Sequence, residues 1–269
     1  MSLLELVVNP NPGRKTLPDC CNPETFADVR AFHRTLPGYQ PTPLVALPDL
    51  AKELGVKGVY IKDESKRFGL NAFKALGASY AIHKLFPDGN VGLTVTATDG
   101  NHGKGMAWST HRLGGHAVVF MPAGTVDSRV EAIRAIGDTE VTVTDLNYDG
   151  TVATAAAYAK EHGGHLVQDT AFEGYEEVPQ NITLGYSTMA AEALEELAAL
   201  GAGEPTHTFL QAGVGSMAGG VAAYLAETCK NPPAMAVVEA WESACVLESI
   251  RQGKLVTIEG HTQTSMAGL

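Results

Sequence analysis

From Gly58 onward, short hydrophobic runs rich in β-branched residues alternate with longer amphipathic segments. The short runs predict strands: GVYIKD, VGLTVTA, HAVVFMP, EVTVTD, HLVQD, HTFLQAG and AMAVVEA. The longer segments predict helices over residues 71–86, 103–113, 127–137, 151–163, 182–200, 216–229 and 243–253. This alternation is typical of βαβ units. We therefore expect an α/β fold whose mostly parallel sheet is covered by helices on both faces.

Composition narrows the possible partners. The 269 residues carry a formal net charge of −11, whereas a surface that binds nucleic-acid phosphates needs clustered Lys and Arg. No apolar run approaches about 18 residues, so no membrane span is expected. The cysteines, Cys20, Cys21, Cys229 and Cys245, match neither a metal site nor a disulfide framework. We expect a cytoplasmic protein with reduced thiols, no metal, and no nucleic-acid or membrane partner.

Ligands of open α/β sheets bind beyond the carboxyl ends of the strands. The loops at 97–105, 168–175 and 211–220 follow predicted strands, and the helix that contains Lys74 also follows one. In QAGVGSMAGG, the glycines allow several backbone N–H groups to point at one anion beside a helix N-terminus. The loop lacks the pattern of a P-loop and of a good dinucleotide site. A single phosphate site and a simple tight turn both remain open.

The loop TATDGNHGKG offers hydroxyl, carboxylate, amide and imidazole groups at the start of a helix. Asp99 or Asn101 could instead serve as a helix cap that accepts backbone hydrogen bonds. His102 has no second ligand at metal-binding spacing and, taken alone, is typical of a packing residue.

Lys74 lies in the apolar stretch LNAFKALGASYA. No acid occupies the positions three or four residues away, which are Leu70, Asn71, Gly77 and Ala78. A buried, unpaired lysine has a lowered pKa and can act as a nucleophilic amine. The segment alone nevertheless favours a surface lysine.

The order of these features carries more information than any one of them. An early lysine, a Gly-Asn-His loop and a distant glycine loop together resemble the pyridoxal-phosphate enzymes of the tryptophan synthase β-like fold, called fold type II. Within that group, SKRFGLNAFKALGASYA, TDGNHGKGMAW, AFEGY and LQAGVGSMAGGV resemble diaminopropionate ammonia-lyases, and the similarity runs over residues 39–269. The resemblance implies two open, mostly parallel twisted sheets flanked by helices.

The resemblance also assigns roles. Lys74 would hold pyridoxal 5'-phosphate as a Schiff base, and Asn101 would meet its phenolic oxygen. The phosphate would lie on the glycine loop, at Gly213, Val214, Gly215, Ser216, Met217 and Gly219. The substrate would contact Thr98, Gly100, His102 and Asp169.

The reaction implied is α,β-elimination of 2,3-diaminopropionate, a small amino acid, to pyruvate and two ammonia. Serine and threonine dehydratases of this fold usually carry Ser where this chain has Asp99. A carboxylate suits a substrate that bears a second ammonium group. Asp169 would supply another acid, and Asp99 could take the α-proton from the face opposite Lys74. A serine or threonine dehydratase, or a non-catalytic protein of the same fold, remains the alternative.

By the same resemblance, residues 1–90 and 181–269 form a large cofactor-binding domain, and residues 91–180 form a small inserted domain. The resemblance further implies a homodimer. Because the ending GHTQTSMAGL reads as a loop that enters a helix, we expect a large domain that is incomplete at its C-terminus. If these 269 residues are the whole polypeptide, we expect it to retain cofactor weakly and to expose apolar surface.

Overall fold

The computed structural model describes residues 5–9, 17–137 and 139–258. Its larger sheet has four parallel strands in the order β5-β4-β3-β6. The strands are β3 (Leu93–Ala97), β4 (His116–Met121), β5 (Glu140–Val143) and β6 (His165–Leu166). The helices around this sheet are α4 (Asn101–Arg112), α5 (Asp127–Arg134) and α6 (Tyr148–Glu161).

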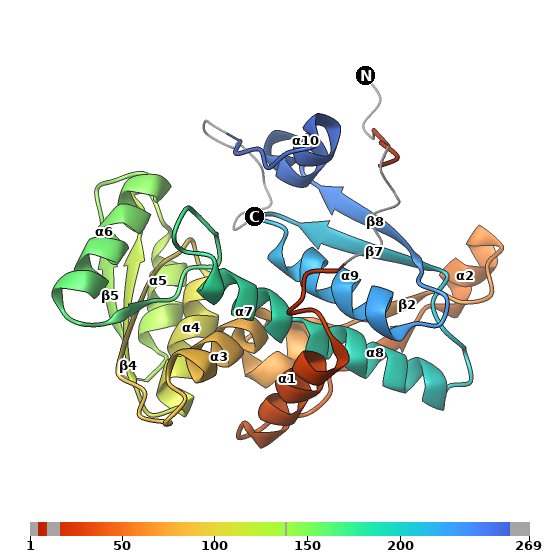
Figure 1. Cartoon of the computed structure of the whole chain (residues 1–269), viewed down its shortest axis with the longest axis horizontal. Helices are drawn as coiled ribbons and strands as arrows, with labels where there is room; N and C mark the ends of the chain where they lie inside the picture. Colours follow the sequence, from red (N-terminus) through yellow and green to blue (C-terminus); the bar gives the residue numbers. More distant parts are fainter. Residues whose placement is uncertain (1–4, 10–16, 138, 259–269) are drawn as a thin grey trace.

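Alternation along β4 assigns each helix to one face of this sheet. Val118 and Phe120 pack with α6, whereas Ala117, Val119 and Met121 belong to the core that includes α4 and α5. Successive side chains of a strand point to opposite faces, so a continuous apolar run is buried on both. Figure 1 shows α6 and α4 on opposite sides of β4.

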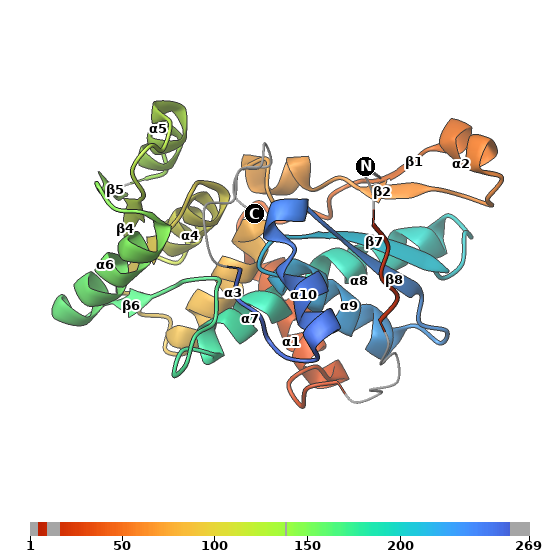
Figure 2. The ribbon, with the colours of Figure 1, turned by 90° about the horizontal axis from the view of Figure 1, so that it is seen from above.

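A second parallel sheet pairs β7 (His207–Ala212) with β8 (Ala234–Glu239), connected through α9 (Ser216–Thr228). The prediction of two mostly parallel sheets in an α/β fold is therefore confirmed. The two sheets lie on opposite sides of a central group of helices (Figures 1 and 2). The remaining helices are α1 (Pro23–Thr35), α2 (Pro48–Leu54), α3 (Lys74–Leu85), α7 (Glu177–Gly185), α8 (Ser187–Ala199) and α10 (Cys245–Gln252), with short 3-10 helices η1 (Glu64–Gly69) and η2 (Trp241–Ser243).

The run GVYIKD forms a strand, but it does not join either parallel sheet. As β2 (Tyr60–Lys62), it pairs antiparallel with β1 (Leu44–Ala46), a strand that the sequence pattern did not reveal. Figure 2 shows β1, α2 and β2 extending from the body of the molecule. Because β1 and β2 are each only three residues long, their hydrophobic pattern is too short to predict the pairing.

Helix α3 lies at the centre and packs against α4 and α7. Glycines allow the close approach: a Cβ on Gly105 of α4 would lie 2.8 Å from the backbone of Lys74 and Ala75. A Cβ on Gly77 of α3 would lie 2.7 Å from the carbonyl oxygen of Ile182 in α7. These contacts fix the start of α3, and therefore Lys74, against the two neighbouring helices.

Several predicted helix limits need correction. Helix α5 ends at Arg134 rather than residue 137, α6 begins at Tyr148 rather than residue 151, and α7 begins at Glu177 rather than residue 182. Helix α3 begins at Lys74 rather than residue 71, since Asn71 has a φ of 55° that a helix does not allow. Helix α4 begins at Asn101, two residues earlier than predicted. The helix predicted over 182–200 is two helices that meet at Tyr186, where hydrogen bonds from Tyr186 N to Thr183 O and from Met189 N to Tyr186 O replace the regular spacing.

A buried ion-pair network holds the segment that leads into α3. Glu192 of α8 is fully buried and accepts hydrogen bonds from Arg67 of η1 at 2.7 and 2.9 Å. Arg30 and Lys62 pair with the same carboxylate at 3.3 and 3.0 Å. One carboxylate thus connects α1, β2, η1 and α8.

None of the helices in the described part of the chain is long and apolar enough to cross a bilayer.

Candidate active site

Lys74 and Asp169 form the centre of the candidate site. Lys74 is the first residue of α3, Asp169 follows β6, and Nζ lies 2.7 Å from Oδ2. Both side chains are largely buried, with exposed fractions of 16% and 8%. The expectation of an unpaired lysine amine is therefore wrong. Spacing along one helix reveals only local partners, and Asp169 lies 95 residues further along the chain.

The charges of the pair stabilise each other. Burial alone lowers the pKa of Lys74, but the charge and hydrogen bond of Asp169 outweigh burial, so the pKa of Lys74 is raised. The sequence had suggested a lowered pKa. Burial alone raises the pKa of Asp169. The electrostatic interactions with His102 and Lys74 more than offset burial, so the pKa of Asp169 lies well below its usual range. At neutral pH the site thus contains an ammonium and a carboxylate.

His102 lies in the first turn of α4 and faces the same carboxylate. Its Nε2 is 2.7 Å from the carbonyl oxygen of Val167, which can only accept, so Nε2 carries a proton. Its Nδ1 lies 3.5 Å from Asp169 Oδ2 and has no hydrogen-bond partner among the described residues. Burial lowers the pKa of His102, which leaves the imidazole neutral at neutral pH with Nδ1 available to a ligand.

The Thr98–His102 loop is held by Thr98 rather than by Asp99 or Asn101. The buried Thr98 hydroxyl accepts the N–H groups of Gly100 and Gly103, each at 3.0 Å. The cap position of α4 is Gly100, so neither Asp99 nor Asn101 caps the helix, and Thr98 binds the N–H groups at its start. Asp99 is half-buried; burial raises the pKa of its carboxyl, partly offset by Arg129. Asn101 begins α4 with an exposed side chain.

The glycine loop lies beside Asp169. Ser216, the first residue of α9, donates its hydroxyl hydrogen to the carbonyl oxygen of Asp169 at 3.1 Å. Gly215 has a φ of 90°, which favours glycine and turns the chain from β7 into α9. The first N–H groups of a helix have no partner within it, so this end of α9 can bind an anion. Val214 is exposed, Gly213 and Met217 are half-buried, and Gly219 lies one turn into α9.

Two tyrosines near the pair were not predicted as site residues. The Tyr148 hydroxyl accepts a hydrogen bond from Gln168 Nε2 at 2.8 Å. Burial raises the pKa of Tyr148, and the charges of Asp169 and Asp99 raise it further. Tyr148 follows β5, so its place after a strand could have suggested it. Tyr186 is fully buried, with a hydroxyl that has no partner among the described residues, and no sequence feature indicated it.

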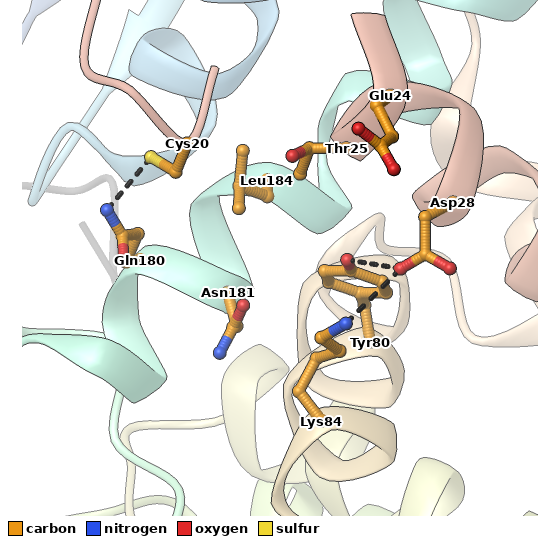
Figure 3. Close-up of a pocket in the computed structure, with 9 residues that line it drawn as sticks. All are labelled: Cys20, Glu24, Thr25, Asp28, Tyr80, Lys84, Gln180, Asn181 and Leu184. Atoms are coloured by element: carbon orange, nitrogen blue, oxygen red, sulfur yellow. Dashed lines mark hydrogen bonds and ion pairs between the residues drawn. The ribbon is translucent and has the colours of Figure 1, made fainter. Parts of the chain in front are cut away.

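A separate hollow of about 420 Å³ lies between α1, α3 and α7 (Figure 3). None of the predicted site residues lines it. Asp28 accepts hydrogen bonds there from Tyr80 at 2.8 Å and from Lys84 at 3.3 Å.

In the described ranges, no group of three or more His, Cys, Asp or Glu side chains could hold a metal ion.

The fold and the arrangement around Lys74 define a class of protein. The chain belongs to the pyridoxal-phosphate dependent enzyme family, whose profile matches residues 35–269, and it has the fold type II architecture. It is 45% identical to the diaminopropionate ammonia-lyases of Escherichia coli K12 and Salmonella typhimurium, over 90% of this chain and 65% and 66% of theirs. This chain therefore spans slightly less than two thirds of the length of these relatives.

Solved structures show the same relationship. A holo diaminopropionate ammonia-lyase from Escherichia coli superposes with a TM-score of 0.85 at 42% identity, covering 93% of this chain and 69% of the other. Another structure of the Escherichia coli enzyme, in complex with an aminoacrylate-PLP azomethine reaction intermediate, gives 0.84 at 44% identity, covering 91% and 67%.

The residues around Lys74 fit pyridoxal phosphate, the cofactor of this family. The cofactor has an aldehyde that a lysine amine can bind, and Lys74 is the amine within the site. It also has a phosphate, and the start of α9 presents backbone N–H groups beside Asp169. Two buried polar atoms, Nδ1 of His102 and the hydroxyl oxygen of Tyr186, have no partner within the described chain and can bond to a ligand.

Proposed function

We propose that this chain carries the active-site portion of an ammonia-lyase that converts 2,3-diaminopropionate into pyruvate and two ammonia. The observation that carries the proposal is a pair of carboxylates in the site, Asp169 at Lys74 and Asp99 near Tyr148. Asp169 contacts the amine directly, and the charges of both Asp169 and Asp99 act on the Tyr148 hydroxyl. Two acids that both act on Tyr148, one of them paired with Lys74, suit a substrate with two amino groups. The identity to diaminopropionate ammonia-lyases supports the same choice.

Lys74 would hold the cofactor, and backbone N–H groups of the glycine loop would bind its phosphate. The predicted contribution of Gly219 needs correction, because its N–H donates to the Gly215 carbonyl oxygen at 2.8 Å. Asn101 would contact its phenolic oxygen. When bound, pyridoxal phosphate supplies an electron sink for negative charge at the substrate α-carbon. The substrate carboxylate would lie against the loop that Thr98 holds in place, with His102 beside it.

The chain's own residues would move the protons. Lys74 Nζ, once released from the cofactor, is placed to take the α-proton of the substrate on its own face. Asp99 would take it from the opposite face, and its raised pKa suits a group that must accept a proton. Asp169, whose carboxylate faces both Lys74 and His102, would hold the distal ammonium, because an amine leaves readily only in its protonated form.

Several wider features belong to the same proposal. Residues 1–90 and 181–269 would form the large domain, and residues 91–180, which contain the four-stranded sheet, the small one. The family resemblance supports a homodimer, and the cysteine pattern supports a cytoplasmic location. The four cysteines, none in a disulfide, are compatible with a reducing compartment.

The test is to add pyridoxal phosphate, reduce with borohydride, identify the labelled peptide, and assay diaminopropionate, serine and threonine. We expect the label on Lys74 and two ammonia per pyruvate from diaminopropionate. A Lys74→Ala variant gives the background of both measurements. Faster turnover of serine or threonine would favour the dehydratase alternative, and a labelled but inactive chain would favour a non-catalytic protein.

The Asp99 role has a separate test. Full activity of Asp99→Asn on both enantiomers of diaminopropionate would contradict the role of Asp99 as the second base. Loss of activity on one enantiomer alone would support it.

A further inference from the structure

The Tyr186 hydroxyl is a buried polar group that is not hydrogen-bonded. The residue is fully buried, and among the described residues no atom accepts or donates a hydrogen bond at its hydroxyl. Buried polar groups in folded proteins nearly always have a partner, because losing water without replacement destabilises the fold. A partner for Tyr186 must therefore come from outside the described chain.

The Tyr186 ring lies in a slot between α3 and α9, at the junction of α7 with α8. Its edge packs against Phe73, with ring centroids 5.2 Å apart. A Cβ on Gly77 would lie 2.7 Å from Cζ of the ring, and a Cβ on Gly220 would lie 3.4 Å from Tyr186 Cβ. Gly77 thus makes room for the ring, whereas Gly220 makes room for the Thr183 carbonyl and lies beside Tyr186 Cβ. Helix α3 begins with Lys74, one turn before Gly77, and α9 begins at the glycine loop.

The hydroxyl also lies in the electric field of the central ion pair. Burial raises the pKa of Tyr186 to about 12; Lys74 acts to lower this pKa and Asp169 to raise it. At neutral pH the phenol is protonated and can donate a hydrogen bond. Asp169 accepts a hydrogen bond from Lys74 at 2.7 Å but, among the described residues, none from Tyr186.

We propose that Tyr186 is a positioning residue whose hydroxyl donates a hydrogen bond to an anionic oxygen of the cofactor held by Lys74. This inference rests on the part of the proposed function that places pyridoxal phosphate in the site. The cofactor is a better acceptor than the substrate because Tyr186 packs against the two helices that carry Lys74 and the glycine loop. The loop at residues 98–102 leads into α4, a helix that the contacts described above do not include.

The test compares Tyr186→Phe with a matched control, Tyr80→Phe. Tyr80 lies on α3, is also fully buried, and donates its hydroxyl hydrogen to Asp28 at 2.8 Å (Figure 3). The measurements are the dissociation constant for pyridoxal phosphate and the urea midpoint of unfolding without added cofactor. We expect Tyr186→Phe to weaken cofactor binding about tenfold or more while its urea midpoint stays equal or rises. Tyr80→Phe should lower the urea midpoint and leave cofactor affinity unchanged.

Titration with pyridoxal, which lacks the phosphate, separates the two anionic oxygens that could accept. Weaker binding of pyridoxal phosphate alone assigns the bond to a phosphate oxygen. Equal weakening for both compounds assigns it to the phenolic oxygen of the ring.

Unchanged cofactor affinity in Tyr186→Phe would overturn the inference. A fall in urea midpoint as large as that of Tyr80→Phe would also overturn it, since the hydroxyl would then have a partner within the protein. A wild-type chain that binds pyridoxal phosphate but releases no pyruvate would refute the proposed reaction and leave the Tyr186 inference in place. A wild-type chain that binds no pyridoxal phosphate would refute both.

Discussion

Removing the carboxylate of Glu192 should destabilise the fold severely. Its side chain has no exposed surface and lies against the guanidinium of Arg67, which is also fully buried. Arg30 and Lys62 share the same carboxylate, and the Tyr39 hydroxyl donates to it at 2.6 Å. Glu192→Ala would remove the carboxylate that Arg67 shares with Arg30 and Lys62, and would leave Arg67 only Glu64, at 2.8 Å, as a counter-charge. Breaking a buried ion pair costs about 3–5 kcal/mol.

Urea denaturation measures this loss. With a slope of about 2–3 kcal/mol per M, the midpoint of Glu192→Ala should fall by roughly 1–2.5 M. Glu192→Gln keeps an acceptor oxygen and the volume but loses the charge, so its midpoint should lie between those of wild type and Glu192→Ala. The control is Glu195→Ala on the same helix, whose side chain is 54% exposed and whose ion pairs contribute about 1 kcal/mol or less. A Glu192→Ala midpoint that matches the Glu195→Ala midpoint would refute the reasoning.

Three further predictions concern pH, packing and the site. His33 is fully buried between Thr188 and the Leu76 carbonyl, and burial lowers its pKa to about 3, so the unfolded chain binds more protons below pH 6.5. Stability should therefore fall between pH 6.5 and 3, by up to about 1.4 kcal/mol per pH unit, and His33→Gln should show a shallower fall in urea titrations across this range. Gly105→Ala should lower the free energy of unfolding by about 1–3 kcal/mol, because its Cβ would meet the α3 backbone at 2.8 Å. The control is Gly219→Ala, whose Cβ would meet nothing closer than 3.8 Å and which should not lose stability. Similar thermal midpoints for both variants would contradict this view of the α3–α4 contact. Asp169→Asn should lower the pKa of Lys74, because the charge of Asp169 is removed. Lys74 should then react faster with an acylating reagent at neutral pH, as followed by peptide mass spectrometry. An unchanged rate would count against the ion pair.

The sequence predicted most of the fold because its signals are local. Runs such as HAVVFMP and HTFLQAG are apolar enough to identify β4 and β7, and each is followed by a helical pattern. The expected order of strands and helices in the two parallel sheets follows from this alternation. The antiparallel pair of β1 and β2 was missed because strands of three residues carry too little pattern.

The break at Tyr186 illustrates a different limit. Residues on both sides favour a helix, so a local pattern predicts one continuous element over 182–200. The break coincides with the packing of the Tyr186 ring against Phe73 and Gly77, residues more than a hundred positions earlier in the chain. Tertiary packing therefore decided where one helix ends and the next begins.

The sequence by itself determined the candidate groups: Lys74 in its apolar segment, Asp99 before the Gly-Asn-His triplet, and the glycine loop at 213–219. Only the tertiary structure decided that Asp169 neutralises Lys74 and that the Ser216 hydroxyl bonds to the Asp169 backbone. The reason is physical. Helix and strand patterns depend on neighbours within a few positions, whereas the pKa of a buried group depends on every charge that the fold brings within a few ångströms, here from 95 residues away.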